Sequence, residues 1–430
     1  MIKPDSAENG GRLYACIDLK SFFASVECAE RGLNAFSGGL VVADPERGLG
    51  TVCLAITPAL KEQGIRNRCR MYEIPRGTWM VTASPRMRLY MRYSVDIFAI
   101  YLRYISPEDI HVYSVDECFI DLTPYLGVYH LTPREFVKML TREVYLETGI
   151  CATAGIGTNL FLAKVALDIL AKHAFDCIGV LNETEFFKVL RHHQPITDFW
   201  NVGPGIAERL KTKFHIVDMA GVAACDEQLL YREFGVGAEF LIDHAHGREP
   251  CTIAEIKAYK PTSSSVGNSQ VLFSDYDRAG AFIVMREMVE QACLELIGRD
   301  ASASGIMLGV SYSRDQIPHL SVSKKLDAPS DSFTDILKVF NQIYEARVDK
   351  KAPIRKLSVA LTGLLPTAMV GFQLDLFSEH QDPLKERQVQ RTIIAIKDRF
   401  GGSSIFRAFS LDPRATGRMR NRLVGGHKAE

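Results

Sequence analysis

Three observations predict a multidomain α+β protein. The 430 residues are too many for one ordinary hydrophobic core, and the prior is about three domains. The composition, 47% hydrophobic and 24% charged, is that of an ordinary soluble globular protein. Strand and helix patterns are mixed over residues 1–180 and again over 262–412, with a mostly helical stretch at 185–247.

The first α+β region opens with a strand that leads directly into a helix. "RLYACIDL" (12–19) is an apolar run typical of a buried strand, and "SFFASVECAERG" (21–32) has apolar residues at helical spacing and closes on a glycine. Further strands are predicted at 39–44, 51–56, 78–84, 109–122 (a hairpin) and 150–158, and helices at 57–65, 85–105, 132–149 and 159–173, the last capped by Asn159.

The second α+β region follows a Ser-rich segment. Residues 253–269 contain few large apolar side chains, which predicts a linker. Beyond it, strands are predicted at 269–275, 305–313, 319–326 and 355–364, and helices at 277–299, 332–347 and 383–400.

Several protein classes are disfavoured by composition. No apolar run of about 18 residues exists, so no membrane span is expected, and "MIKPDSAENGG" at the N-terminus predicts no secretory signal. Ten scattered cysteines without a CxxC pair argue against disulfides or a zinc site and fit a reducing cytoplasm. Net charge is zero, although basic residues outnumber acidic ones from Arg391 onward, which predicts a basic tail at 413–430.

Three carboxylates are candidates for a metal site. Asp18 ends the first strand, and Asp116 with Glu117 lies in the turn of the hairpin. If the hairpin pairs with the first strand, these oxygens converge and suit Mg²⁺, the usual cation of phosphoryl transfer. The alternative is an ordinary turn, since Asp and Glu are common there.

The motifs around these acids resemble those of a known enzyme family. "CIDLKSFFASVE" and "YSVDECFIDL" are similar to the two metal-binding motifs of the Y-family (translesion) DNA polymerases, and "AGIGTNLFLAKVALDILAK" resembles their third motif. "TPALKEQGIRNRCRMYEIP" and "LVGGHK" resemble the UmuC-like branch, among its Gram-positive UV-damage repair proteins. The resemblance implies a right-hand polymerase with a palm (1–20 and 79–180), small fingers (21–78), a helical thumb (181–250), a linker (251–261) and an α+β little finger (262–412).

The same resemblance implies roles for individual residues. Two Mg²⁺ ions are expected on Asp18, Asp116 and Glu117, with the carbonyl of Leu19 completing one shell. The incoming deoxynucleoside triphosphate is expected to contact Phe22, Phe23, Lys61 and Lys164, and the ring of Phe23 to exclude a ribose 2′-hydroxyl. At Pro58-x-x-Lys61 the sequence departs from a Tyr-x-x-Arg pattern found in some branches, and a lysine binds phosphate only as a point charge.

Two segments are candidates for DNA contact and a third for a protein partner. "FWNVGPGIAERLKTKF" (199–214) is typical of a helix–hairpin–helix, in which Gly203 and Gly205 offer backbone N–H groups to a phosphate of primer–template DNA. "SSSVGNSQVLF" offers Ser265, Gly267 and Ser269 for similar contacts. "FQLDLFSEH" resembles the peptide that binds the bacterial sliding clamp, through Gln373, Leu374, Leu376 and Phe377 in a loop at 372–378.

Two other functions compete with a lesion-bypass polymerase acting in DNA repair and the SOS response. A catalytically inactive accessory protein that binds DNA and the clamp would have little use for the three acids and Lys164. A nucleotide cyclase with a two-carboxylate palm would leave the helix–hairpin–helix and the last region without a role. The sequence leaves open which lesions are bypassed and whether accessory SOS proteins are needed.

Overall fold

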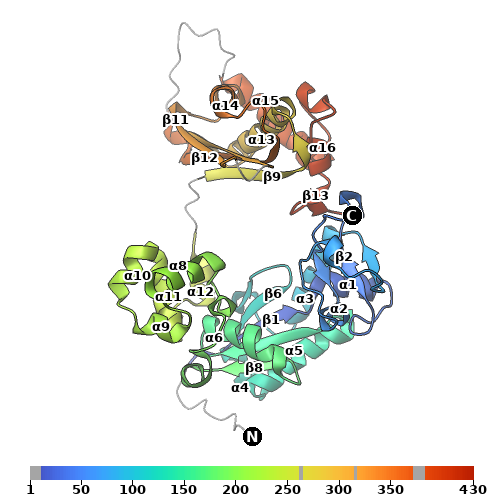
Figure 1. Cartoon of the computed structure of the whole chain (residues 1–430), viewed down its shortest axis with the longest axis vertical. Coiled ribbons are helices and arrows are strands. Elements are labelled where there is room, and N and C mark those ends of the chain that lie inside the picture. Colours follow the sequence, from blue (N-terminus) through green and yellow to red (C-terminus); the bar gives the residue numbers. More distant parts are fainter. Residues whose placement is uncertain (1–10, 261–264, 314–316, 371–382) are drawn as a thin grey trace. The chain divides into compact units, whose positions relative to one another are not determined.

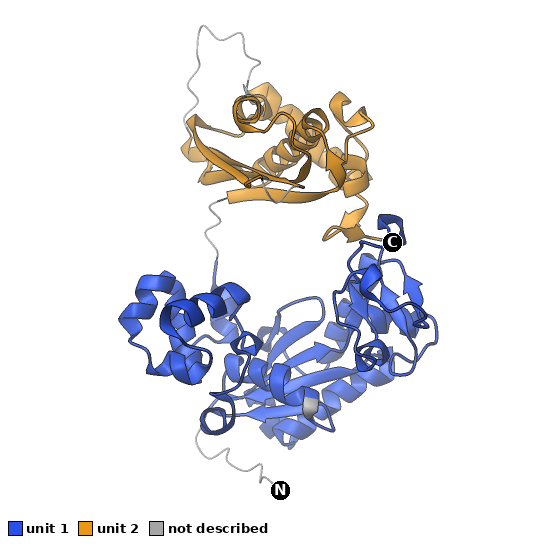
Figure 2. Cartoon of the chain, viewed as in Figure 1, with its two compact units in different colours: residues 1–260, 430 blue, residues 261–429 orange. Residues whose placement is uncertain are grey.

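The computed structural model describes residues 11–260, 265–313, 317–370 and 383–430. The chain forms two compact units, residues 1–260 with Glu430, and residues 261–429 (Figure 2). The predicted palm, fingers and thumb therefore all belong to the first unit. The second unit extends beyond residue 412, so the segment predicted as a separate basic tail is part of it up to Ala429.

A five-stranded sheet forms the centre of the first unit, in the order β5-β6-β1-β7-β8 (Figure 1). Strand β1 pairs antiparallel with β6 along one edge, where Asp18 lies opposite Glu117, and antiparallel with β7 along its other edge. The strands are β1 (Tyr14–Leu19), β5 (Ile110–Val112), β6 (Glu117–Asp121), β7 (Ala152–Gly157) and β8 (Ile178–Leu181).

The two faces of this sheet are covered differently because side chains alternate along each strand. Ala15, Ile17 and Leu19 face a core shared with three long helices. Tyr14, Cys16 and Phe119 face the opposite side, where they pack against Leu160 and Ala163. The helices are α1 (Phe22–Glu30), α3 (Met87–Tyr101), α4 (Thr123–Tyr129), α5 (Pro133–Thr148), α6 (Leu160–Val165) and α7 (Glu183–Glu185).

The predicted fingers contribute β2 and β3 to a three-stranded sheet in the order β3-β2-β4, which has its own small core. Its third strand, β4, lies beyond residue 78, the predicted end of the fingers. The strand expected at 51–56 is shorter than predicted, because only Ala55 and Ile56 pair regularly with β2, and Val52 forms an isolated bridge with Arg70. The elements are β2 (Leu40–Val42), β3 (Ala55–Ile56), α2 (Pro58–Glu62) and β4 (Val81–Ala83).

The helical region packs as a small bundle around Leu210, Leu230 and Leu241. The prediction of a linker at 251–261 is wrong for its first half. Thr252 caps a helix there, and Ile253 is buried against the central sheet. The helices are α8 (Pro204–Phe214), α9 (Met219–Ala224), α10 (Glu227–Phe234), α11 (Ala238–Ala245) and α12 (Ile253–Ala258).

The second unit is a four-stranded antiparallel sheet in the order β11-β10-β12-β9, with α13 and α14 packed on one face. Its C-terminal segment is tied to α13, because the buried carboxylate of Glu287 accepts the backbone N–H groups of Thr416 and Gly417. The elements are β9 (Ser265–Tyr276), α13 (Arg278–Gly298), β10 (Ala301–Tyr312), β11 (Leu320–Ser330), α14 (Phe333–Arg347), β12 (Ile354–Pro366), α15 (Pro383–Phe400), α16 (Gly417–Arg420), β13 (Leu423–Val424) and β14 (His427–Lys428).

Candidate active site

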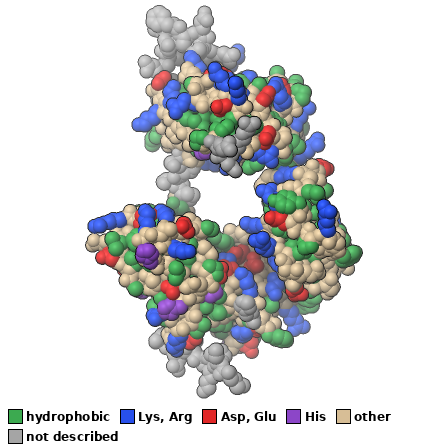
Figure 3. Space-filling model, in the orientation of Figure 1, with side chains coloured by type: hydrophobic (Ala, Val, Ile, Leu, Met, Phe, Trp, Pro, Cys, Tyr) green, Lys and Arg blue, Asp and Glu red, His purple; other side chains and the backbone are tan. Residues whose placement is uncertain are grey.

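The structure brings the three predicted acids to one end of the central sheet. Asp18 and Glu117 are directly opposed on β1 and β6, so their side chains project from the same face. The N–H of Leu19 donates to the carbonyl of Asp116 at 2.9 Å, which closes the ladder at the point where both strands end. Figure 3 shows acidic side chains gathered in the hollow of the first unit.

Lys164 is the basic partner of this cluster. Its Nζ lies 2.8 Å from Oε1 of Glu117 and 3.1 Å from Oδ2 of Asp168, one turn further along. Two features bring its helix this close to the sheet. The side chain of Asn159 caps α6 by accepting the N–H of Leu162, as predicted. A side chain at Gly155 would meet the carbonyl of Ala163 at 2.1 Å, so only glycine permits the approach.

Asp18 is electrostatically the most perturbed of the acids. Its pKa is raised to about 7, chiefly by burial and then by the neighbouring Asp116 and Glu117 carboxylates, against the opposing effect of Lys164. A buried carboxylate beside two others forms the kind of oxygen-rich donor set that a divalent cation would neutralise. The chemistry of the donor set therefore fits Mg²⁺.

The acids do not form a finished metal cage. The carboxylate of Asp116 accepts the hydroxyl of Ser114 at 2.7 Å, and Glu117 is held by Lys164. Within the described ranges, no group of three or more His, Cys, Asp or Glu side chains is close enough to hold an ion. A cation shared with Asp18 would compete with the ammonium of Lys164 for Glu117.

Lys61, one of the residues expected to bind phosphate, lies within electrostatic range of Asp18 and of two other lysines. Loss of solvent around its ammonium lowers the pKa of Lys61, while the Asp18 carboxylate raises it and Lys172 and Lys20 lower it. No side chain caps α1, and the buried hydroxyl of Ser21, its N-cap residue, has no partner within the described chain. A helix N-terminus with free N–H groups beside several lysines suits a phosphate group.

The two predicted aromatic residues differ in their surroundings. The ring of Phe22 is 2% exposed and belongs to the core, and a nucleotide contact of this residue stays a prediction. Phe23 is partly buried and stacks on Tyr90, with ring centroids 4.7 Å apart and planes 20° from parallel. A sugar contact of Phe23 likewise stays a prediction.

The glycines of the predicted helix–hairpin–helix lie at the start of α8. Gly203 is its N-cap residue and Gly205 is in its first turn. A methyl group added at either position would meet no atom within 4 Å, so the described chain has no packing need for glycine there. The open backbone leaves room for an approaching phosphate, although DNA contact here stays a prediction.

The sheet of the second unit has one face on which no helix of the described residues packs. Gly267 and Ser269 of β9 are exposed on this face, and the hydroxyls of Ser358 and Ser269 lie 3.0 Å apart. Ser265, two residues before Gly267 on β9, lies on the same face because alternate residues of a strand share a face. Two cross-strand rows run over the face: Ser269–Ser358–Gly309–Ser321, all small residues, and Gly267–Ala360–Met307–Ser323, small except for Met307.

One predicted site cannot be located in the structure, and two residues near the acids were not predicted from the sequence. The clamp-binding residues Gln373, Leu374, Leu376 and Phe377 lie outside the described residues. Asp168, four residues after Lys164, was missed although its helical spacing could have indicated the pair. Cys16, whose Sγ lies 3.0 Å from Oε1 of Glu117, shares a sheet face with Asp18, but no motif in the sequence signals that contact.

Comparisons with known proteins identify the family. The impB/mucB/samB family matches residues 17–168, and the C-terminal domain of that family matches 263–376. UvrX, a UV-damage repair protein of Bacillus subtilis (strain 168), is 31% identical over 96% of this chain and 97% of its own length. The chain belongs to the impB/mucB/samB family. This confirms the predicted place among the Y-family DNA polymerases, on the UmuC-like branch near UvrX.

Two further relatives extend the comparison. DNA polymerase IV 2 of Bacillus subtilis (strain 168) is 30% identical over 96% of this chain and 97% of its own length. A solved Y-family DNA polymerase chimera, Dbh-Dpo4(243-245)-Dbh, has a TM-score of 0.62 and 19% identity, covering 82% of this chain and 99% of the chimera. This structural similarity confirms the predicted multidomain α+β polymerase fold. Searched along the described residues, no helix is both long and apolar enough to span a membrane.

Proposed function

We propose that this chain is a template-directed, error-prone DNA polymerase that extends a primer by two-metal phosphoryl transfer and copies past damaged template bases. The observation that carries the proposal is the pairing of Asp18 with Glu117 across β1 and β6, with the ammonium of Lys164 at 2.8 Å from Glu117. Carboxylates and an ammonium crowded at a strand end contribute little to the stability of the fold, because these charges would be solvated more favourably at the surface.

In this mechanism the acids hold the metals. Asp18 and Asp116 would each contribute to both Mg²⁺ sites, Glu117 to the site beside the primer terminus, and the Leu19 carbonyl to one shell. When bound, the ions lower the pKa of the primer 3′-hydroxyl and neutralise charge that develops on the triphosphate.

The other residues bind and orient the nucleotide. Lys61, Lys164 and the N-terminus of α1 would hold the triphosphate, and the ring of Phe23 would lie beneath the sugar and exclude a 2′-hydroxyl. Lys164 forms an ion pair with Glu117. Transfer of its ammonium to a phosphate would therefore free that carboxylate when the nucleotide binds.

The DNA duplex would be gripped without regard to sequence. The open backbone at Gly203 and Gly205 and the hydroxyl rows of the second unit, with Ser265, Gly267 and Ser269, offer donors suited to phosphates. Such contacts depend strongly on salt.

Partners and context follow from the same proposal. The segment with Gln373, Leu374, Leu376 and Phe377 would tether the enzyme to the bacterial sliding clamp, raising its local concentration at primer ends. UvrX is named for UV-damage repair, and a comparable cytoplasmic role in the SOS response is proposed for this chain. Extension assays with and without the clamp, on the wild type and a Leu376→Ala/Phe377→Ala variant, test the tether.

Primer extension with Mg²⁺ and four deoxynucleotides tests the central proposal. The wild type should extend the primer, and Asp116→Ala should bind DNA but not extend it. Asp96→Ala, which removes an exposed carboxylate from α3, is the matched control and should remain active. Equal activity of wild type and Asp116→Ala defeats the metal role. DNA binding by a wild type that incorporates nothing favours an inactive accessory protein.

A further inference from the structure

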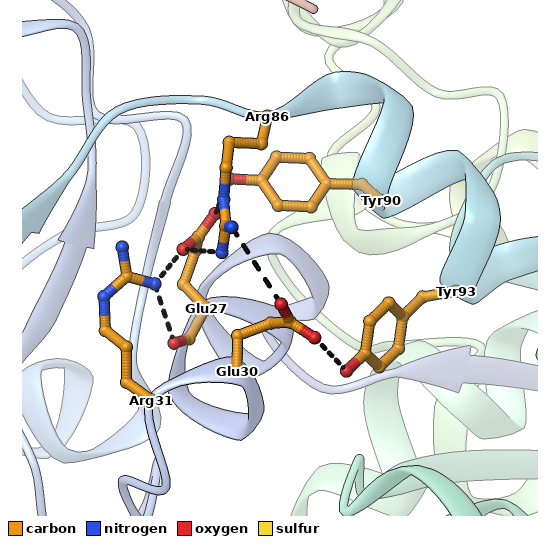
Figure 4. A network of polar contacts seen from close by, with 6 residues as sticks. All are labelled: Glu27, Glu30, Arg31, Arg86, Tyr90 and Tyr93. Atoms are coloured by element: carbon orange, nitrogen blue, oxygen red, sulfur yellow. Dashed lines mark hydrogen bonds and ion pairs between the residues drawn. The ribbon is translucent and has the colours of Figure 1, made fainter. Parts of the chain in front are cut away.

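A buried charged network joins α1 to the start of α3 (Figure 4). The side chain of Glu27 is 0% exposed, and Arg86 donates to both its oxygens, from Nε to Oε1 at 2.9 Å and from Nη2 to Oε2 at 2.7 Å. The hydroxyl of Tyr90 donates to Oε1 at 2.7 Å, and Arg31 donates to Oε2. The buried carboxylate thus accepts four hydrogen bonds from three residues.

This network ends on the predicted sugar-selecting ring. Phe23 and Glu27 are four residues apart on α1, so they lie on one side of the helix. Tyr90, which is 0% exposed, meets both: its ring stacks on Phe23 at 4.7 Å, and its hydroxyl is held by Glu27. Two points of attachment fix the phenol ring, and the fixed ring supports one side of Phe23.

From this geometry we infer that Glu27 and Tyr90 are positioning residues for the exclusion of ribonucleotides. The inference rests on the proposed function of Phe23. Exclusion of a 2′-hydroxyl by a flat ring is steric, so its strength depends on how far the ring can retreat when an extra oxygen presses on it. A Phe23 supported only by soft packing would yield, whereas one backed by a hydrogen-bonded phenol resists.

Electrostatics in the network favour this rigidity. Although burial acts in the opposite direction, hydrogen bonds from Arg86, Tyr90 and Arg31 hold the pKa of Glu27 below its usual value. Burial and the adjacent Glu27 carboxylate raise the pKa of Tyr90. The carboxylate therefore stays charged and the phenol stays a donor throughout the neutral pH range.

Tyr90→Phe tests the inference, because it removes only the hydroxyl and keeps the stacking ring. The chain supplies a matched control. Tyr93, one turn later on α3, donates its hydroxyl to Oε1 of Glu30 on α1 at 2.8 Å, but stacks on no ring of the described residues. Tyr93→Phe therefore removes a tyrosine–glutamate hydrogen bond between the same two helices, in this case an exposed one, without touching Phe23.

Selectivity is measured as the ratio of kcat/KM for dCTP to kcat/KM for CTP opposite a template G. Tyr90→Phe should lower this ratio by about five- to tenfold, through faster CTP incorporation with dCTP incorporation nearly unchanged. Tyr93→Phe should leave it at the wild-type value. An unchanged ratio in Tyr90→Phe overturns the inference. Equal losses in both variants also overturn it, because they indicate general loosening between α1 and α3.

A second readout does not depend on activity. 4-Fluorophenylalanine placed at position 23 reports ring motion through its ¹⁹F relaxation, which should change in Tyr90→Phe and not in Tyr93→Phe. Unchanged relaxation in both variants overturns the positioning role even in a protein without polymerase activity. If the wild type extends no primer while the ring motion changes as expected, the proposed function fails and the mechanical link stands.

Discussion

The ammonium of Lys164 lies 2.8 Å from Oε1 of Glu117, between that carboxylate and the carboxylate of Asp168. A cation bound at Glu117 would therefore compete with this ammonium for the same carboxylate oxygen. This relationship connects the two halves of the proposed chemistry, because the residue that neutralises Glu117 is also the one expected to bind the triphosphate.

Replacing Lys164 should impair nucleotide incorporation far more than it impairs folding. Lys164→Gln removes the positive charge, so we expect kcat/KM for each deoxynucleotide to fall by about 10²-fold. Lys188→Gln, which removes an exposed lysine from a surface ion pair with Glu185, is the control and should behave as wild type. Single-nucleotide kinetics would count against the predicted phosphate contact if the two variants were equally active.

Asp18 predicts a specific pH dependence of stability in the absence of metal. Its pKa is raised from 3.8 to about 7 in the folded chain, so the folded state binds more protons than the unfolded state between those values. The contribution to the free energy of unfolding is therefore fully present below pH 4, is lost as pH rises toward 7, and remains lost above it.

Asp18→Asn should accordingly be more stable than wild type at pH 8 in EDTA, by about 2–4 kcal/mol, and similar to it at pH 4. Urea unfolding at both pH values measures the difference. Adding Mg²⁺ at pH 8 should stabilise the wild type and leave Asp18→Asn nearly unchanged. A variant that is less stable than wild type at pH 8 contradicts the predicted repulsion.

Phe22 and Phe23 should respond to truncation in different ways. Phe22→Ala empties a core position and should lower the free energy of unfolding by about 3–5 kcal/mol. Phe23→Ala should cost less stability and should raise ribonucleotide incorporation, because it removes the ring predicted to meet the sugar. Denaturation curves and incorporation of CTP against dCTP are measured on the same preparations. A larger stability loss in Phe23→Ala, or a larger rise in CTP incorporation in Phe22→Ala, would contradict the two assignments.

The open sheet face of the second unit predicts where added charge weakens DNA binding. Ser269→Glu places a negative charge on the exposed hydroxyl row and should raise Kd for primer–template DNA by about tenfold at low salt, with a smaller effect at high salt. Thr392→Glu adds the same charge at an exposed position of α15, outside that face, and should have little effect. Fluorescence anisotropy distinguishes the two, and equal weakening would exclude a specific role for the face.

Local sequence was sufficient to predict most of the elements. The alternation in 12–19, the helical spacing in 85–105 and the Asn159 cap each depend on neighbours in sequence, and each prediction is confirmed. The errors arose where long-range contacts decide. The Ser-rich segment after Cys251 begins with a helix because Ile253 is buried against the central sheet, a contact that local composition does not show.

The sequence by itself determined which residues are candidates for the chemistry, because the motifs around Asp18, Asp116 and Glu117 are short and contiguous. Only the tertiary structure decided their relations: the strand register that opposes Asp18 and Glu117, the core position of Phe22, and the buried link from Glu27 through Tyr90 to Phe23. The physical reason is that register, burial and side-chain stacking arise from residues distant along the chain, whose meeting depends on the packing of the whole unit.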